Sequence, residues 1–233
     1  MPTTGSRRFF ALIITLLLPC LICAGLALIV ERPFWRFPQQ APPHRRAAVA
    51  LRDDVIPFQK WGTKVFTLPY LEQYYEYTVY FTQSPDDATQ QAFIATLTQA
   101  LAQYDSVDLF FLAHSNHYID WVATIDPALR AKIRLVYNTG CYDAAQAQAW
   151  LQLGAQTAVA HPGLSDSPVF YFFFLRRWTL GEPLDRVVAA SNERMRGMFE
   201  MASAATQGYL DPDERFINSQ ALCFGACSIT IGG

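Results

Sequence analysis

Short apolar runs alternate with amphipathic segments along most of this chain. Four of the runs are rich in aromatic and β-branched side chains, which is typical of strands. They span residues 74–81, 107–113, 133–137 and 157–160. After the first run, Phe93, Leu97 and Leu101 recur every four residues, as on the apolar face of a helix. This alternation predicts an α/β fold, with a mostly parallel sheet and helices on both faces.

Further helices are predicted from capping residues, glycine stops and the helical spacing of apolar positions. Ser84 and Pro85 open the helix that carries Phe93. The other predicted helices span residues 127–132, 144–153, 168–178 and 183–202. Residues 228–231 are expected to form a last strand.

A long uncharged segment precedes this alternating part. It covers residues 9–30, and a helix of 22 residues spans about 33 Å, enough for the core of a bilayer. Arg7 and Arg8 stand before it, as in a signal anchor or in a signal peptide that is cleaved near Ala27. The length of the segment favours the anchor. The two arginines favour a cytoplasmic N-terminus, so we expect the folded domain outside the cytoplasm.

Three regions follow from this reading of the chain. Residues 1–30 are the N-terminal signal anchor or transmembrane helix, and residues 31–50 are a proline-rich linker. Residues 51–233 are the folded α/β domain. We therefore expect the protein to meet the membrane through its N-terminal helix.

The composition narrows the range of functions. Charged residues make up 16% of the chain and hydrophobic residues 52%, which excludes a disordered polyelectrolyte. A net charge of -2 argues against a nucleic-acid-binding protein. Five cysteines are too few for a disulfide-built scaffold. Cys223 and Cys227 are four residues apart, which fits no metal or redox motif, although an exported domain could oxidise this pair.

Reactive side chains follow three successive predicted strands. His114 and His161 come directly after predicted strands, and Cys141 follows the strand at 133–137 after Asn138, Thr139 and Gly140. Because the carboxyl ends of parallel strands meet at one edge of a sheet, all three are expected along the same edge. An imidazole near a thiol can take its proton and later pass it to a leaving group.

The surroundings of Cys141 are suited to nucleophilic catalysis. A helix expected to start near Ala144 would present its positive end, which favours a thiolate. Gly140 leaves open space beside the sulfur, and backbone N–H groups near it are candidate donors to an oxyanion. Taken alone, Cys141 is more simply a buried structural thiol.

A strand ending in His and a small residue, followed by a strand ending in a small residue and Cys, resembles the caspase, gingipain and separase group of cysteine peptidases, which includes the CHAT domains. The likeness continues after Cys141, through Gly154-Ala155 and the strand at 157–160, and covers roughly residues 74–231. The resemblance implies a caspase-like three-layer sandwich, a cysteine endopeptidase acting on a protein or peptide substrate, and no cofactor or metal.

Carried over residue by residue, the resemblance makes Cys141 the nucleophile and His114 the general base. Ser115 stands where the family has a glycine that contributes to the oxyanion hole, which puts that contribution in question. Asp166 belongs to the matching downstream pattern and is a candidate cleft residue. His161 is expected either in the cleft or as a structural residue before Pro162-Gly163. His117 is expected to contact the catalytic residues and not the substrate.

Two other functions use the same residues. One is a caspase-like domain that has lost catalysis and acts as a membrane-tethered interaction module. The other is a metal-binding domain, because His and Cys side chains suit borderline metals. Its ligands would come from His114, His117, His161 and Cys141.

Overall fold

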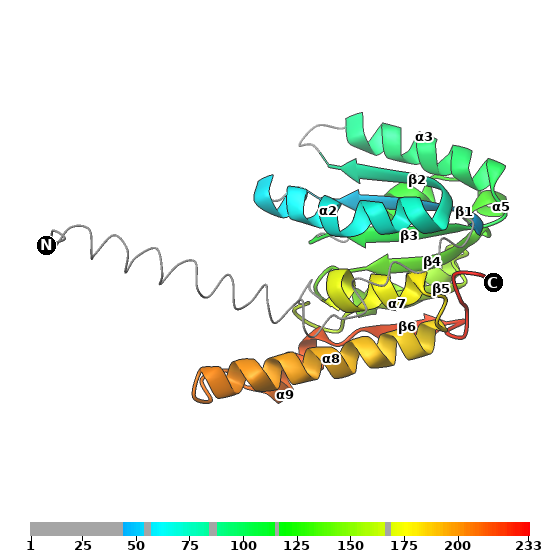
Figure 1. The fold of residues 1–233 in the computed structure, drawn as a ribbon. Coiled ribbons are helices and arrows are strands. Elements are labelled where there is room, and N and C mark those ends of the chain that lie inside the picture. The colour runs from blue at the N-terminus through cyan, green and yellow to red at the C-terminus, as the bar shows by residue number, and fades with distance from the viewer. Residues whose placement is uncertain (1–43, 54–56, 84–87, 115–116, 166–168) are drawn as a thin grey trace, which may run out of the picture. The chain divides into compact units, whose positions relative to one another are not determined.

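The computed structural model describes residues 44–53, 57–83, 88–114, 117–165 and 169–233. Its centre is a six-stranded sheet with the strand order β2-β1-β3-β4-β5-β6 (Figure 1). Five strands are parallel, and only β6 pairs in the antiparallel sense with β5. The strands are β1 (His44–Arg52), β2 (Tyr75–Thr82), β3 (Val107–Leu112), β4 (Ile133–Asn138), β5 (Thr157–Ala160) and β6 (Leu222–Gly225). The expected mixed α/β fold with a mostly parallel sheet is confirmed.

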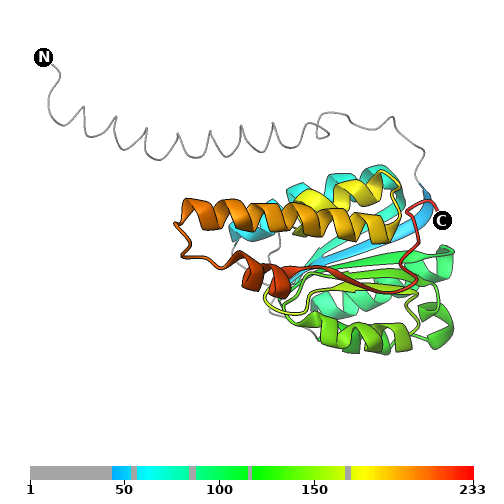
Figure 2. The same ribbon diagram turned by 90° about the horizontal axis from the view of Figure 1, so that it is seen from below.

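Helices cover both faces of the sheet, as Figure 2 shows. On one face lie α2 (Pro57–Tyr74), the π-helical segment η3 (Val169–Phe174), α7 (Leu175–Thr179) and α8 (Leu184–Ala205). On the other lie α3 (Ala88–Gln103), α4 (Tyr118–Ala123), α5 (Pro127–Arg130) and α6 (Ala147–Gln152). The 3-10 helix η2 (Asp143–Gln146) leads into α6, and α9 (Pro212–Ser219) packs against α8.

Each helix layer closes a separate aromatic core against the sheet. On the α3 side, Phe111 of β3 stacks on Trp150 of α6 at a ring distance of 5.3 Å. On the α8 side, Tyr137 of β4 packs against Phe174 at 4.4 Å. Because both faces are covered, every residue of β3 and β4 is buried, which explains why they are mostly apolar, with Asp108, Arg134 and Asn138 as buried polar exceptions.

Two strands differ from the expectation. β1 begins at His44, inside the range 31–50 that was expected to be a linker, so the folded domain starts earlier than residue 51. The last strand is β6 at 222–225, whereas residues 228–231 form no strand. The reason is that the carbonyl oxygens of Thr230 and Ile231 accept hydrogen bonds from Arg134 and Arg46 and do not join a ladder.

The helices were predicted less completely than the strands. Helices α2 and α9 were not expected, and the single helix expected over 168–178 is divided between η3 and α7. Every helix among the described residues is too short or too polar to cross a bilayer. The expected anchor and most of the linker lie outside the described residues.

Candidate active site at the carboxyl edge of the sheet

The ends of β3 and β4 bring His114 and Cys141 to the same edge of the sheet. The two strands are neighbours, and Phe111 of β3 pairs with Asn138 of β4. The Thr139 N–H donates to the Phe111 carbonyl at 2.9 Å, which continues the ladder beyond β4. His114 and Cys141 each follow three residues after the Phe111–Asn138 pair. Adjacent strands are about 4.8 Å apart, so the two residues follow neighbouring strand ends at the same edge of the sheet.

His114 is exposed, and its backbone is fixed by the neighbouring strand end. Its N–H donates to a carboxylate oxygen of the buried Asp53, which directly follows β1. Within the part of the chain that the structure describes, no hydrogen bond joins the His114 ring to the Cys141 thiol. Ser115, the expected oxyanion contributor after His114, lies outside the described residues. The structure therefore fixes the main chain of His114 and leaves its ring at the surface.

Cys141 is a half-buried free thiol in the loop between β4 and η2. The Ser165 N–H donates to its Sγ at 3.4 Å. The next residue, Tyr142, has a φ of 61°, a left-handed conformation that costs energy for a bulky side chain and is found mostly at turns and functional sites. A sharp turn therefore presents the sulfur beside the sheet edge.

The oxyanion donor expected at Gly140 is already engaged. The Gly140 N–H donates to the Asn138 side-chain oxygen at 3.0 Å. The Tyr142 N–H is also used, in a 2.9 Å bond to the Gly163 carbonyl. Among the described residues the Cys141 N–H has no hydrogen-bond partner. It is therefore the best placed backbone donor to the oxyanion that would form on a carbonyl group attacked by the Cys141 sulfur.

The helix expected to polarise the thiol starts too late to do so. Asp143–Gln146 form a 3-10 turn, and α6 begins only at Ala147, six residues after Cys141. The field of a helix terminus falls off within one turn. Along the described part of the chain, the structure therefore places no α-helix terminus within one turn of the thiol.

His161 has a structural role in the fold. It is buried, with Nδ1 2.8 Å from the Ser219 carbonyl oxygen and Nε2 3.2 Å from the Tyr137 hydroxyl. Both ring nitrogens are therefore engaged, and the ring ties the end of α9 to β4 and β5. Of the two roles expected for His161, the structure supports the structural one. Asp166, the other candidate cleft residue, lies outside the described residues.

His117 lies at the start of α4 and is exposed. Its ring packs against Tyr118 at 4.4 Å and against Trp121 at 5.3 Å between ring centres. These aromatic contacts explain its position without a partner in the site. Across the described residues, no group of three His, Cys, Asp or Glu side chains could hold a metal ion.

Two buried carboxylates at this edge were missed by the sequence reasoning. Asp53 follows β1, and Asp143 lies two residues after Cys141. Burial raises the pKa of Asp143 to about 7, and the charge of Asp53 adds to the rise, whereas the Gly140 N–H and the Asn138 side chain oppose it. Among the described residues, neither Asp143 oxygen accepts a hydrogen bond of normal geometry. The run 47–51 before Asp53, apolar like the other strands, was the signal for the first of them.

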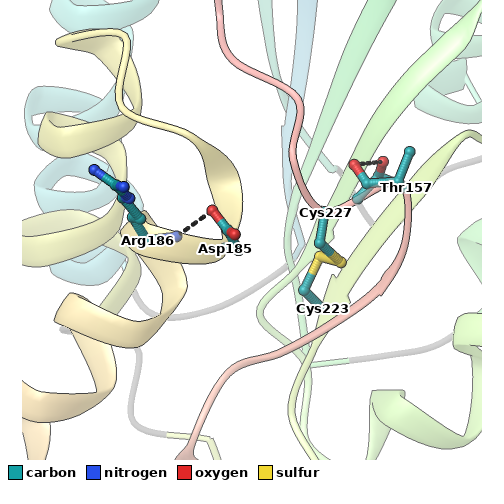
Figure 3. Close-up of a disulfide and its surroundings, with 6 residues drawn as sticks. Thr157, Asp185, Arg186, Cys223 and Cys227 are labelled. Atoms are coloured by element: carbon teal, nitrogen blue, oxygen red, sulfur yellow. Dashed lines mark hydrogen bonds between the residues drawn. A yellow bond between two sulfur atoms is a disulfide. The ribbon is translucent and has the colours of Figure 1, made fainter.

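Cys223 and Cys227 form a disulfide on the C-terminal segment beside β5 (Figure 3). In the β5–β6 ladder Cys223 pairs with Val159, and Cys227 lies two residues beyond Gly225, which pairs with Thr157. The Thr157 hydroxyl donates to the Ala226 carbonyl at 2.9 Å, and the Cys227 carbonyl accepts the Asp185 N–H at the start of α8, at 2.8 Å. The disulfide therefore lies along the edge strand β6, which β5 separates from β4.

No protein-family model matches this chain, and no curated protein or solved structure does so either. The functional argument therefore depends on the fold and on the geometry of the strand ends.

Proposed function

We propose that this protein is a membrane-anchored, caspase-like cysteine peptidase in which Cys141 is the nucleophile and His114 the general base. The observation that supports the proposal is the register of β3 and β4: Phe111 pairs with Asn138 in adjacent parallel strands, and His114 and Cys141 each follow three residues later. The three-layer arrangement of helices around a mostly parallel sheet is compatible with the caspase-like sandwich that the resemblance implies.

The proposed reaction uses the Cys141 thiol, the His114 imidazole and the Cys141 N–H. His114 takes the thiol proton, and the Cys141 sulfur attacks the carbonyl carbon of a peptide bond. The oxyanion is met by the Cys141 N–H. The C–N bond then breaks, the amine leaves with the proton from His114, and a thioester remains. Water, deprotonated by His114, hydrolyses the thioester and restores the thiol.

The same proposal places the folded domain outside the cytoplasm. Residues 9–30 supply the anchor, and the Cys223–Cys227 disulfide supports an oxidising compartment, since disulfides persist there and are rare in the cytosol. A reporter fused after Gly233 that is active only outside the cytoplasm tests this part. Reporter activity only in the cytoplasm would contradict it.

The dyad is tested by alkylation of Cys141 at pH 7. We expect His114→Ala to slow the labelling of Cys141 at least tenfold, because the thiol loses its base. His117→Ala is the matched control, since it removes an exposed imidazole only three residues away. Equal labelling rates in the wild type and in His114→Ala would refute the dyad.

A catalytically inactive interaction module is the second candidate. It is favoured by the absence, among the described residues, of a hydrogen bond between the His114 ring and the Cys141 thiol. Incubation with a peptide library separates the two functions. Cleavage that disappears in Cys141→Ala supports the peptidase, whereas no cleavage by a protein whose Cys141 is readily alkylated supports the inactive module.

A further inference from the structure

Three large apolar side chains are exposed around Cys141. Tyr142 is 57% exposed, Leu164 52% and Ile217 60%. They come from three segments that are far apart in the sequence: the loop after β4, the loop after β5, and α9. Exposed apolar residues are normal when scattered, but a group of them beside a reactive residue indicates a binding surface.

Backbone hydrogen bonds hold these three segments side by side. The Tyr142 N–H donates to the Gly163 carbonyl at 2.9 Å, and the Gly163 N–H donates to the Asn218 carbonyl at 2.8 Å. Leu164 and Ile217 are the direct neighbours of Gly163 and Asn218. One residue after Leu164, the Ser165 N–H reaches the Cys141 sulfur. The three side chains thus border the segment that carries the thiol.

The arrangement is rigid because α9 is fixed in place. A Cβ on Gly163 would lie 2.9 Å from the Asn218 Cα, so the close approach of α9 requires glycine at this position. The His161 ring holds the next residue, Ser219, through its carbonyl. Preorganised surfaces bind with a smaller loss of entropy than mobile ones.

The three segments themselves are uncharged: residues 141–142, 162–165 and 217–219 include no Lys, Arg, Asp or Glu. Exposed Asp213 and Glu214 lie one turn before Ile217 on α9. A charged ligand group placed here would lose water without gaining an ionic partner from the three segments. An apolar group would gain contact with the three exposed side chains.

We propose that Tyr142, Leu164 and Ile217 form an apolar rim that binds an uncharged, apolar side chain of the peptide substrate next to the bond attacked by Cys141. This inference rests on the proposed peptidase function and adds the class of substrate side chain. The occupant is a substrate rather than a separate partner protein, because the rim is continuous with the loop that presents the thiol.

Peptidyl ketone inhibitors that alkylate thiols test the rim on the full-length protein. We compare reagents that differ only in the side chain next to the reactive ketone, which is Leu, Glu or Lys, with iodoacetamide as a probe that has no side chain. The Leu reagent is expected to label Cys141 at least tenfold faster than the Glu and Lys reagents. Leu164→Ser with Ile217→Ser should remove most of this preference and leave the iodoacetamide rate within about twofold of the wild-type rate.

Met201→Ser is the matched control, because Met201 is an exposed apolar residue on α8 outside the rim. It should keep the preference for Leu. Equal rates for the three reagents in the wild type, or a preference that survives in the double variant, would overturn the rim and leave the peptidase proposal intact. If iodoacetamide labels Cys141 and none of the peptidyl reagents does, both proposals fail.

Discussion

Buried carboxylates have different partners at the two ends of the parallel sheet. At the amino ends, the carboxylate of Asp108 is fully buried, and both of its oxygens accept hydrogen bonds. Arg134 donates to it from Nε at 2.9 Å and also from Nη2, and the Tyr75 hydroxyl donates at 2.6 Å. Trp178 in turn donates to the Tyr75 oxygen at 2.9 Å. Burial, and then the charge of Asp108, raise the pKa of Tyr75 well above its ordinary value, which keeps it a donor.

At the carboxyl ends, Asp53 lies 3.9 Å from the buried Arg52 guanidinium, but other buried polar groups lack such partners. Asp143 is nearly as buried as Asp108, but among the described residues it forms no ion pair, and its pKa is raised to about 7. The Thr139 hydroxyl is also buried without a hydrogen-bond partner among the described residues. Satisfied polar networks stabilise a fold, whereas strained and under-satisfied groups collect at functional sites. The comparison therefore supports a structural role for the amino end and agrees with the proposal of a site at the carboxyl end.

The largest effect is expected at the amino end. Asp108→Ala leaves the Arg134 guanidinium buried without its counter-ion, which should lower the free energy of unfolding by about 3–5 kcal/mol. Urea unfolding followed by circular dichroism measures it. The double variant Asp108→Leu with Arg134→Leu removes both charges and should recover part of the loss. A loss below about 1 kcal/mol in Asp108→Ala would show that this network is not structural.

A pH-dependent effect is expected at the carboxyl end. Folded Asp143 keeps its proton up to about pH 7, whereas an unfolded aspartate releases it near the ordinary pKa of 3.8. Its contribution to stability is therefore complete below pH 4 and is lost as the pH rises through 7. Between pH 5 and 7 this loss amounts to about 2 kcal/mol.

Asp143→Asn should abolish that loss. Urea unfolding at pH 5, 6 and 7 should show the variant gaining about 2 kcal/mol on the wild type over this range. Asp120→Asn, at an exposed position of α4, is the matched charge control. A difference between variant and wild type that stays constant with pH would mean that Asp143 is ionised like an exposed aspartate and that the two sheet ends are alike.

The disulfide on the edge strand β6 adds to the stability of the fold. Replacing Cys223 and Cys227 by serine opens a loop of about five residues, for which chain entropy predicts a loss of about 2 kcal/mol. Thermal unfolding with and without reductant measures it. The alkylation rate of Cys141 should be unchanged, because β5 separates β6 from β4 and from the loop that carries Cys141. A slower rate would show that the edge strand and the Cys141 loop are coupled.

Features of the two sheet ends that follow from local sequence were mostly predicted, whereas contacts between distant segments were not. β3, β4 and β5 were predicted from short apolar runs, since strands buried on both faces need such residues. The order of His114 and Cys141 after neighbouring strands followed from the same runs. β1 was missed because the prolines before it suggested a linker and because its alanines are poor strand formers. Because β1 was not predicted, Asp53, which directly follows it, was missed as well.

The rest depended on contacts between distant segments. The Arg134–Asp108 pair joins β4 to β3, and the His161–Ser219 contact joins β5 to α9 across 58 positions. No local pattern marks such pairs. The raised pKa of Asp143 depends on its burial in the fold. The sequence around this aspartate is turn-like and gives no sign of that burial. The sequence therefore predicted which residues follow the neighbouring strand ends, but not which distant residues contact them.

The sharpest test of the carboxyl end is expected from Asp53. Its carboxylate accepts the His114 N–H, which fixes the main chain at this residue, and lies 3.9 Å from the buried Arg52 guanidinium. Asp53→Leu leaves that N–H without its acceptor and Arg52 without this carboxylate, and should cost about 1–3 kcal/mol of stability. Asp53→Asn keeps an acceptor oxygen and should cost less.

A positioning role predicts more than this loss of stability. If the bond holds His114 at the level of Cys141, the alkylation rate of Cys141 should fall about threefold or more in Asp53→Leu, since small displacements of a catalytic group are costly. Asp53→Asn should restore most of the rate. An unchanged rate in Asp53→Leu, together with the expected loss of stability, would make Asp53 a purely structural residue like Asp108, and the contrast between the two ends of the sheet would then rest on Asp143 alone.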